Sequence, residues 1–285
     1  MTRRMAWVTT QEALGRDPDH PYGVPALEAA GIEVATVDWK DPAVDWSSFD
    51  RVLPRSTWDY PEVMDRFLAW IDAVDAVTDL RNSPATMRWS MDKHYLADLD
   101  GAGIPVTPTE FVEVGAIPGF PRGGFVVKPA VGAGSRDVAA YREGQEDVAA
   151  EHVSRLHARG ASVLVQPALA SIAVEGEWPL VFFHGDYSHA ASKRVTLANA
   201  AAVDDLYAEE LNAPHMASAE QVAVATAVVD LAAARFGVPT YARVDVVRGD
   251  DGRMCVLEVE LVEPSLFLPE GGPEAVARFV DAVTA

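Results

Sequence analysis

The chain has 285 residues and a formal net charge of −20, and 49% of its residues are hydrophobic. This composition is typical of a globular protein, and the negative charge argues against a nucleic-acid groove or an anionic membrane surface as its partner. The single cysteine, Cys255, rules out an internal disulfide and favours the reducing cytoplasm, and no apolar stretch is long enough for a signal peptide or a membrane span. A homodimer is compatible with the sequence, which does not show which apolar side chains are exposed.

Residues 1–82 alternate apolar strands with helices, a pattern typical of a parallel sheet covered by helices. The expected strands are MAWVTT at 5–10, IEVATVDW at 32–39 and FDRVLPRS at 49–56, and the expected helices are PYGVPALEAAG at 21–31 and PEVMDRFLAWIDAV at 61–74. An Asn-Ser-Pro turn at 82–84 interrupts this pattern, so we place the end of the N-terminal α/β domain at residue 82.

The rest of the chain mixes strands and helices in the manner of two α+β subdomains, which we place at 83–165 and 166–285. In the first, we expect helices at 91–103 and 146–160 and strands at 123–129, 138–142 and 162–169. In the second, we expect strands at 179–185, 187–195, 241–248 and 254–262, and helices at 218–237 and 273–283. Ser218 and Gln221 form the capping box of the long helix, and residues 198–205 are irregular.

The two strands of the last hairpin carry an acidic face. A turn centred between Asp250 and Asp251 would pair Arg243 with Glu258 and Asp245 with Val256. Because side chains alternate along a strand, one face then holds Arg243, Asp245, Glu258 and Glu260, and the opposite, apolar face holds Cys255. Three carboxylates beside one arginine favour a hard cation such as Mg²⁺ bound together with phosphates. The alternative is a solvated edge hairpin.

Two lysines lie where they could meet an anion. Lys128 ends an apolar strand and is followed by the glycine-rich loop AVGAGSRD, in which Ser135 adds a hydroxyl group. The backbone N–H groups of such a loop favour a phosphate cradle, and the alternative is an ordinary turn. Lys93 is expected in the first turn of a helix capped by Ser90, where a surface lysine is the simpler interpretation.

Further polar groups are candidates for binding a small substrate. In PRSTWDY, Arg55 is expected to hold a carboxylate, Ser56 and Thr57 to donate hydrogen bonds, and Trp58 and Tyr60 to wall a pocket, because ligands bind at the carboxyl ends of strands in open α/β sheets. The alternative is a tight turn with Trp58 in the core. Lys193, Arg194 and His189 form a second polar cluster suited to face ATP or substrate, although a surface position is favoured for His189. Glu263 is expected to hold a substrate amine, and the alternative is a solvated loop.

The ordered set of these segments resembles the ATP-grasp superfamily over residues 81–285. The segments that carry the resemblance are MDKHYLADLDGAGIPVTPT, FVVKPAVGAGSRD, VLVQPAL, EGEWPLVFF, ARVDVV and LEVELVEP. No single segment is specific to this superfamily, but the order in which the segments follow one another is. The resemblance implies an N-terminal parallel-sheet domain followed by two α+β subdomains that clamp ATP.

The resemblance also implies roles for individual residues. Lys93 and Lys128 would contact the ATP phosphates, and the loop around Gly134 and Ser135 would close over them. The residues implied at adenine are Gln166, Ala168 and Leu169, and those implied near ribose are Glu175 or Glu177.

The same resemblance implies that the hairpin binds the metal and contacts the transferring phosphoryl group. Asp245, Glu258 and Glu260 would bind Mg²⁺, and Arg243, together with Lys128, would stabilise the transferring group. Many ATP-grasp enzymes have Asn where this chain has Glu260, which adds a negative charge here.

A narrower resemblance concerns PRSTWDY, SHAASKR and ELVEPSLFL, which are similar to segments of the cyclo-ligases that form cycloserine from O-ureido-serine. This resemblance implies ATP-dependent activation of a carboxylate as an acyl phosphate, followed by intramolecular attack of nitrogen that closes a ring. One alternative is an intermolecular ligase that joins an amino acid to an amine. A non-catalytic nucleotide-binding protein is disfavoured by the intact lysines and acidic face.

Overall fold

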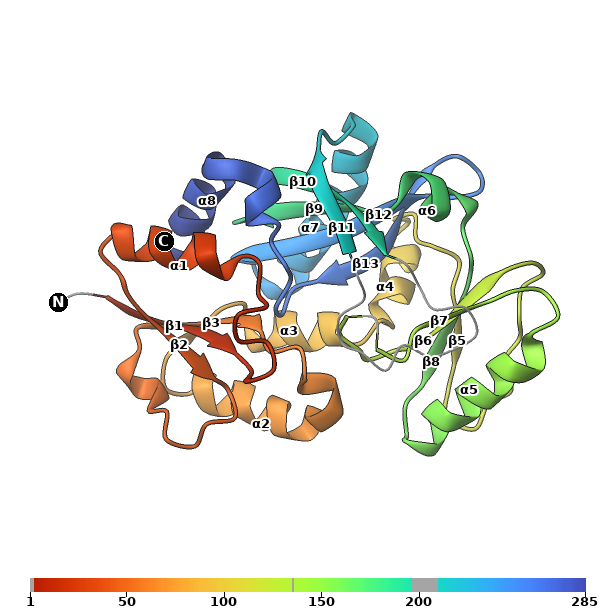
Figure 1. The fold of residues 1–285 in the computed structure, drawn as a ribbon, viewed down its shortest axis with the longest axis horizontal. Coiled ribbons are helices and arrows are strands. Elements are labelled where there is room, and N and C mark those ends of the chain that lie inside the picture. Colours follow the sequence, from red (N-terminus) through yellow and green to blue (C-terminus); the bar gives the residue numbers. More distant parts are fainter. Residues whose placement is uncertain (1–2, 135, 196–209) are drawn as a thin grey trace.

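The computed structural model describes residues 3–134, 136–195 and 210–285, and its strands form three sheets (Figure 1). The N-terminal sheet is parallel, with the order β2-β1-β3-β4. Its strands are β1 (Arg4–Thr9), β2 (Glu33–Asp38), β3 (Arg51–Ser56) and β4 (Asp79–Leu80), and its helices are α1 (His20–Ala29) and α2 (Met64–Asp75), with short 3-10 helices at Trp46–Ser48 and Tyr60–Val63. The predicted parallel sheet is confirmed, and only the two-residue β4 was not expected.

Alternation along β1 explains why this sheet is covered on both faces. Trp7 packs in one core cluster with Leu27 of α1, whereas Val8 packs in another with Phe67 of α2. Successive side chains of a strand point to opposite faces, so a continuous apolar strand is buried between two layers.

The central sheet is antiparallel, with the order β5-β8-β6-β7. Its strands are β5 (Glu110–Val112), β6 (Phe125–Pro129), β7 (Ala139–Tyr141) and β8 (Val163–Pro167), and α5 (Glu146–Ala158) packs on it. Before this sheet come α3 (Pro84–Met91) and α4 (Tyr95–Gly101). The single helix predicted over 91–103 is therefore wrong at its start: Ser83 caps α3, Ser90 lies inside it, and Lys93 lies between α3 and α4.

The C-terminal sheet is antiparallel, with the order β11-β10-β9-β12-β13. Its strands are β9 (Trp178–Phe183), β10 (Asp186–Val195), β11 (Glu210–His215), β12 (Tyr241–Arg248) and β13 (Met254–Glu260), and its helices are α6 (Ala170–Glu175), α7 (Ala219–Phe236) and α8 (Leu268–Thr284). The capping box of α7 is present as predicted. The irregular stretch predicted at 198–205 lies outside the described residues.

Packing crosses the predicted domain limits at 82 and 165. Leu99 of α4 packs with Phe182 of the C-terminal sheet, and Trp7 of the N-terminal sheet packs with Phe279 of α8. The three sheets are thus joined by shared cores, and the exact limits stay a prediction.

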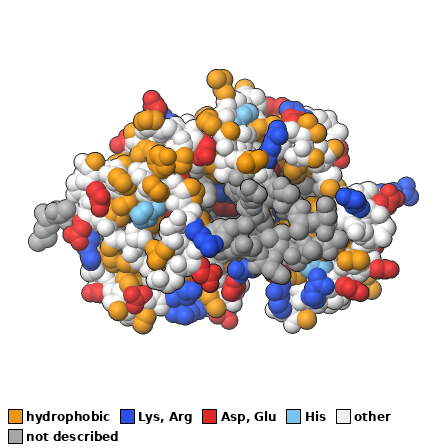
Figure 2. Space-filling model, viewed as in Figure 1, with side chains coloured by type: hydrophobic (Ala, Val, Ile, Leu, Met, Phe, Trp, Pro, Cys, Tyr) orange, Lys and Arg blue, Asp and Glu red, His pale blue; other side chains and the backbone are white. Residues whose placement is uncertain are grey.

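The distribution of side chains on the outer surface agrees with the globular composition of the chain. On the face seen in Figure 2, acidic and basic side chains are distributed around the outline, with apolar side chains between them. Among the described helices, none combines the length and the apolar character that crossing a membrane requires.

Candidate active site

A cavity of about 540 Å³ lies where the three sheets meet. Its walls include Trp58 from the loop after β3, Lys128 from β6, Gln166 from β8 and Glu258 from β13. Residues far apart in the sequence therefore face one space, which is the usual form of a binding site for small molecules.

The acidic face of the hairpin forms one wall, but its register differs from the prediction. Arg243 pairs with Glu260 and Asp245 with Glu258, because the turn is one residue longer than expected and Leu257 is inserted as a bulge next to Val256. Each difference moves the pairing by one residue. Either difference alone would turn the side chains of one strand to the opposite face. The two together cancel, so the four predicted residues still share one face.

The bulge changes the environment of Cys255. Beyond the bulge, Cys255 and Val247 pack with Leu169 rather than with the core under Val246 and Val256, so the predicted assignment of Cys255 to that apolar face is wrong. Cys255 is nevertheless buried, and burial raises the pKa of its thiol, so the residue is a packing side chain.

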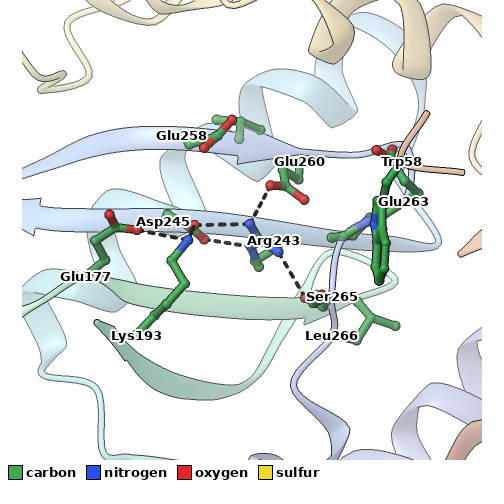
Figure 3. Close-up of polar contacts among 12 residues, drawn as sticks. Trp58, Glu177, Lys193, Arg243, Asp245, Glu258, Glu260, Glu263, Ser265 and Leu266 are labelled. Atoms are coloured by element: carbon green, nitrogen blue, oxygen red, sulfur yellow. Dashed lines mark hydrogen bonds and ion pairs between the residues drawn. The ribbon is translucent and has the colours of Figure 1, made fainter. Parts of the chain in front are cut away.

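Arg243 is the centre of the polar network in Figure 3. It donates from Nε to Asp245 at 2.8 Å, from Nη2 to Glu260 at 2.5 Å and from Nη1 to the Ser265 carbonyl oxygen at 3.3 Å. Burial lowers the pKa of Arg243, but the carboxylates of Asp245 and Glu260 raise it more, and the net pKa lies above the ordinary value. The guanidinium is thus a fixed positive charge at the cavity wall.

Lys193 of β10 forms ion pairs with two carboxylates of the site. Its Nζ lies 2.9 Å from Glu177 and 3.1 Å from Asp245. Asp245 has only 1% of its surface exposed, and its carboxylate is held by both Arg243 and Lys193. Asp245 is therefore a paired interior group, whereas Glu177 lines the cavity.

Glu258 faces the two lysines predicted at phosphates. Lys93 Nζ lies 3.1 Å from Glu258 Oε1 and 3.2 Å from the carbonyl oxygen of Gly132, in the glycine loop. Burial raises the pKa of Glu258, but Lys93 and Lys128 lower it, to a net value of about 2. Burial, partly opposed by Glu258, lowers the pKa of Lys128 to about 8. This end of the cavity therefore collects positive charge around one ionised carboxylate.

At the opposite end of the cavity lie two carboxyl groups whose pKa values are raised. Burial raises the pKa of Glu260 to about 7 despite Arg243, and burial together with Glu260 raises the pKa of Glu263 to about 8. No side chain of the described residues donates a hydrogen bond to the Glu263 carboxylate, and Trp58 donates to its backbone oxygen at 3.4 Å. This end is suited to a ligand cation, which would favour the charged carboxylate.

Backbone groups suited to a base edge lie at the hinge between β8 and α6. The Ala168 N–H donates to Gly124 O, and Leu169 O accepts from Ile172 N. The Ala168 carbonyl and the Leu169 N–H have no backbone partner among the described residues. They form an acceptor and a donor beside Leu257 on the cavity wall.

Comparison with known proteins identifies the family. Residues 5–82 match a family model described as the N-terminal domain of D-cycloserine synthetase DcsG. The chain is 39% identical to the cycloserine biosynthesis protein DcsG of Streptomyces lavendulae over 292 residues, which cover 98% of this chain and 97% of the relative. The chain belongs to the D-cycloserine synthetase family of ligases. The crystal structure of D-cycloserine synthetase DcsG matches with a TM-score of 0.90 and 38% identity over 98% of both chains.

More distant structures share the fold of this synthetase family. D-alanine–D-alanine ligase from Bacillus anthracis has a TM-score of 0.70 at 16% identity, over 100% of this chain and 96% of its own. The ATP-grasp ligase PsnB has a TM-score of 0.62 at 21% identity, over 100% and 99%. The predicted ATP-grasp fold and the resemblance to the cycloserine-forming ligases are confirmed.

Most residues that the sequence marks for this ligase site do meet at the cavity. They are Trp58, Tyr60, Lys93, Lys128, Gly134, Gln166, Ala168, Leu169, Glu177, Lys193, Arg243, Glu258, Glu260 and Glu263. Ser135 lies outside the described residues. Their roles in binding stay predictions.

Other predicted residues do not reach the cavity lining. Arg55, Ser56 and Thr57 are fully buried behind it, Glu175 pairs with Arg248 at 3.3 Å, and Arg194 donates to the Val174 carbonyl oxygen. None of these five residues lines the cavity, and neither does Asp245, so their contact with a ligand stays a prediction. His189, expected at the surface, is buried and hydrogen-bonded to Leu266 O, so that prediction is wrong.

The cavity is also lined by residues that were not predicted from the sequence. Arg16 and Pro18 follow β1, Thr107 precedes β5, and Arg136 lies in the glycine loop. Ligands bind at the carboxyl ends of parallel strands, and β1 ends beside β3, so the signal that marks Trp58 after β3 also marks Arg16 after β1.

Proposed function

We propose that this enzyme uses ATP to activate the carboxylate of a small amino-acid-like substrate and then closes a ring by intramolecular attack of nitrogen, as in the formation of cycloserine from O-ureido-serine. The observation that supports the proposal is the separation of positive and negative side chains within one cavity. Lys93 and Lys128 stand at one end, Glu260 and Glu263 stand at the other, and Arg243 lies between them.

ATP fits the cationic end of the cavity. The Ala168 carbonyl and the Leu169 N–H suit the adenine edge, and Leu257 supplies an apolar wall. The phosphates would then meet Lys93 and Lys128, with Gly134 in the covering loop and Glu177 near ribose. Ammonium groups attract phosphates more strongly in a protein cavity than in bulk water, because the effective dielectric constant is lower there.

Magnesium fits the acidic hairpin face in a specific way. Glu258 and Glu260 line the cavity with side chains that are 25% and 29% exposed, and hard oxygen ligands of this kind hold Mg²⁺ together with nucleotide phosphates. Asp245 is held by Arg243 and Lys193, so it can serve as a further ligand only if Lys193 is displaced. A bound Mg²⁺ would neutralise charge on the phosphates.

In the first step, an oxygen of the substrate carboxylate attacks the γ-phosphorus of ATP, and the bond to the ADP oxygen breaks. The product is an acyl phosphate, and ADP leaves. Lys128 and Arg243 provide fixed positive charges for the oxygens of the transferring group, and preorganised charges of this kind give most of the catalysis in phosphoryl transfer.

In the second step, the ureido nitrogen bonded to oxygen attacks the acyl carbon. A carbon–nitrogen bond forms, the carbon–oxygen bond to phosphate breaks, and the nitrogen loses its proton. The carbamoyl group is then released by transfer to water. Because the nucleophile belongs to the same molecule, the cavity has only to hold one substrate in a folded conformation, which raises its effective concentration.

Glu263 is suited to hold the substrate's ammonium group during both steps. Its carboxylate faces the cavity without a side-chain partner among the described residues, next to Trp58 (Figure 3). A cation bound there would offset the burial and the repulsion from Glu260 that raise the pKa of Glu263.

The test is release of ADP and phosphate with O-ureido-serine as the only amino-acid substrate. We expect release without a second amine, and strict dependence on one would favour the intermolecular ligase instead. Glu258→Gln should reduce turnover by about 10²-fold or more, a typical loss for one preorganised electrostatic group. Asp251→Asn, in the exposed turn of the same hairpin, is the matched control and should keep wild-type turnover.

A further inference from the structure

The segment 263–268 follows β13 and carries the substrate end of the cavity. Glu263, Ser265 and Phe267 line the cavity, and Leu268 begins α8. The backbone of this segment is held by side chains that come from elsewhere in the chain.

Asp19 holds two N–H groups of the segment. Its carboxylate accepts from Leu266 N at 2.5 Å and from Leu268 N at 2.9 Å, although it lies almost 250 residues earlier. Asp19 is the N-cap residue of α1, but its side chain does not cap that helix. Phe267, the N-cap residue of α8, has a positive φ of 49° and gives no side-chain cap. Asp19 therefore caps α8 from the N-terminal domain.

Arg55 holds the start of the same segment. Its Nη2 donates to Pro264 O at 2.5 Å and lies 3.4 Å from Asp19 Oδ2, and its guanidinium stacks over the ring of Tyr241 at 5.0 Å. Arg55 is fully buried, and its Nε and Nη1 atoms have no hydrogen-bond partner in the described structure. Burying a partly satisfied guanidinium costs stability, so a role is expected for it.

Two further side chains complete the support. Arg243 donates to Ser265 O and His189 Nε2 lies 2.8 Å from Leu266 O, so three consecutive carbonyl groups each meet a different side chain. Such support restricts the backbone to one conformation and presents Glu263 at a fixed place. Sites held in this way lose less entropy when a ligand binds.

We propose that Asp19 and Arg55 are positioning residues, which fix the segment 263–268 so that Glu263 meets the amino group of the substrate. This inference rests on the proposed function. Neither residue lines the cavity, and the hydrogen bonds that the described structure gives their side chains go to each other and to the segment 263–268. Their loss should therefore weaken binding of the amino-acid substrate and leave ATP binding unchanged.

The variant Asp19→Asn tests this directly. An amide at this position keeps one acceptor oxygen and replaces the other with an NH2 group, so one of the N–H groups of Leu266 and Leu268 faces a donor. The variant also loses the charge that faces Arg55. We expect KM for the amino-acid substrate to rise by about tenfold or more, within the range that a small misplacement costs, while KM for ATP stays within about twofold. Equal rises in both KM values would overturn the proposal.

The control is Asp79→Asn. Asp79 pairs with Arg51 at 2.7 Å and with Arg81 at 2.8 Å in the same N-terminal domain, away from the segment. This variant should lower the melting temperature without a selective change in either KM. Where Asp19→Asn does not fold, Arg55→Lys carries the test, because lysine keeps the charge but lacks the planar group that faces Pro264 O. It should give the same selective rise in KM, and an unchanged KM would count against the proposal.

Amide hydrogen exchange separates this inference from the proposed function. In Asp19→Asn, the N–H groups of Leu266 and Leu268 should exchange faster than in the wild type, while the hairpin 241–260 keeps its protection. Unchanged exchange in 263–268 would overturn the positioning role. The measurement needs no substrate, so it tests the positioning role independently of turnover. Failure of the wild-type enzyme to form ADP with O-ureido-serine would contradict the proposed function alone.

Discussion

Arg243 holds Asp245 in a bidentate ion pair, although the two residues lie only two positions apart on β12. The two distances are 2.8 and 3.2 Å, and Lys193 approaches the same carboxylate at 3.1 Å. Residues i and i+2 share a face of a strand, which is why one carboxylate can orient the arginine toward the cavity. Asp245 therefore sets the direction of the charge that we assign to the transferring phosphoryl group.

The first prediction concerns this pair. Asp245→Asn should lower the free energy of unfolding by about 3–5 kcal/mol, because Arg243 and Lys193 would remain buried with less opposite charge. Turnover should fall by about 10²-fold, since the guanidinium would no longer be held in place. Chemical denaturation and ADP formation measure the two effects. A variant with wild-type stability would show that the pair is not structural.

The second prediction concerns Lys128 and ATP. Burial lowers the pKa of Lys128 to about 8, so the ammonium group of the free enzyme loses its proton as pH rises through that value. Bound phosphates favour the protonated form, and ATP affinity should therefore fall by about tenfold between pH 7 and pH 9.

Lys128→Arg provides the control for that titration. Arginine stays charged over this range, so ATP affinity of the variant should not depend on pH between 7 and 9. Equilibrium binding of ATP measures both proteins. An equal pH dependence in the variant would assign the titration to a different group.

The third prediction concerns Glu263. Its pKa of about 8 means that the carboxyl group is mostly neutral at pH 6 and ionises as pH rises. Since an ammonium group binds the ionised form, KM for the amino-acid substrate should fall by about tenfold or more from pH 6 to pH 8. In Glu263→Gln that fall should disappear and KM should be high throughout.

Stability gives an independent check on Glu263. The pKa in the folded state lies above the ordinary value of 4.5, so the folded state retains a proton that the unfolded chain has lost between about pH 4.5 and pH 8. Stability from this group is therefore present at low pH and is lost as pH rises through that window. Glu263→Gln should raise the melting temperature at pH 8 and have little effect at pH 5.

The fourth prediction concerns Gly176, which lies between α6 and β9. Its φ is +82°, and a Cβ atom there would lie 2.7 Å from the carbonyl oxygen of Lys193. Gly176→Ala should therefore strain the backbone and displace Lys193 from Glu177. We expect a stability loss of about 1–3 kcal/mol or more, with reduced turnover.

Gly144→Ala is the matched control for this contact. Gly144 has a similar φ of +85°, but no heavy atom lies within 4 Å of its added Cβ. It should show only the cost of the backbone conformation, about 1 kcal/mol, and normal turnover. Thermal unfolding and ADP formation of the two variants isolate the clash with Lys193, and equal losses would argue against it.

The sequence by itself determined the order and type of most elements, because periodicity and turn residues are local properties. It also predicted that Arg243, Asp245, Glu258 and Glu260 share a face, although it assigned Cys255 to the wrong one. Which face a side chain occupies changes with each one-residue shift in the pairing of the strands. The shift at the turn and the shift at Leu257 cancelled, so the predicted face was kept. A bulge depends on how two strands fit over the core, so neither strand's own pattern reveals it.

Only the tertiary structure decided which marked residues meet the cavity. Glu177 and Glu175 lie two positions apart, yet one lines the cavity and the other pairs with Arg248. Arg55 looked suited to a substrate carboxylate, but it is buried against Pro264 O and Asp19. The destination of a long polar side chain depends on which distant backbone groups need a partner, and that is fixed by the packing of α8 against the N-terminal domain.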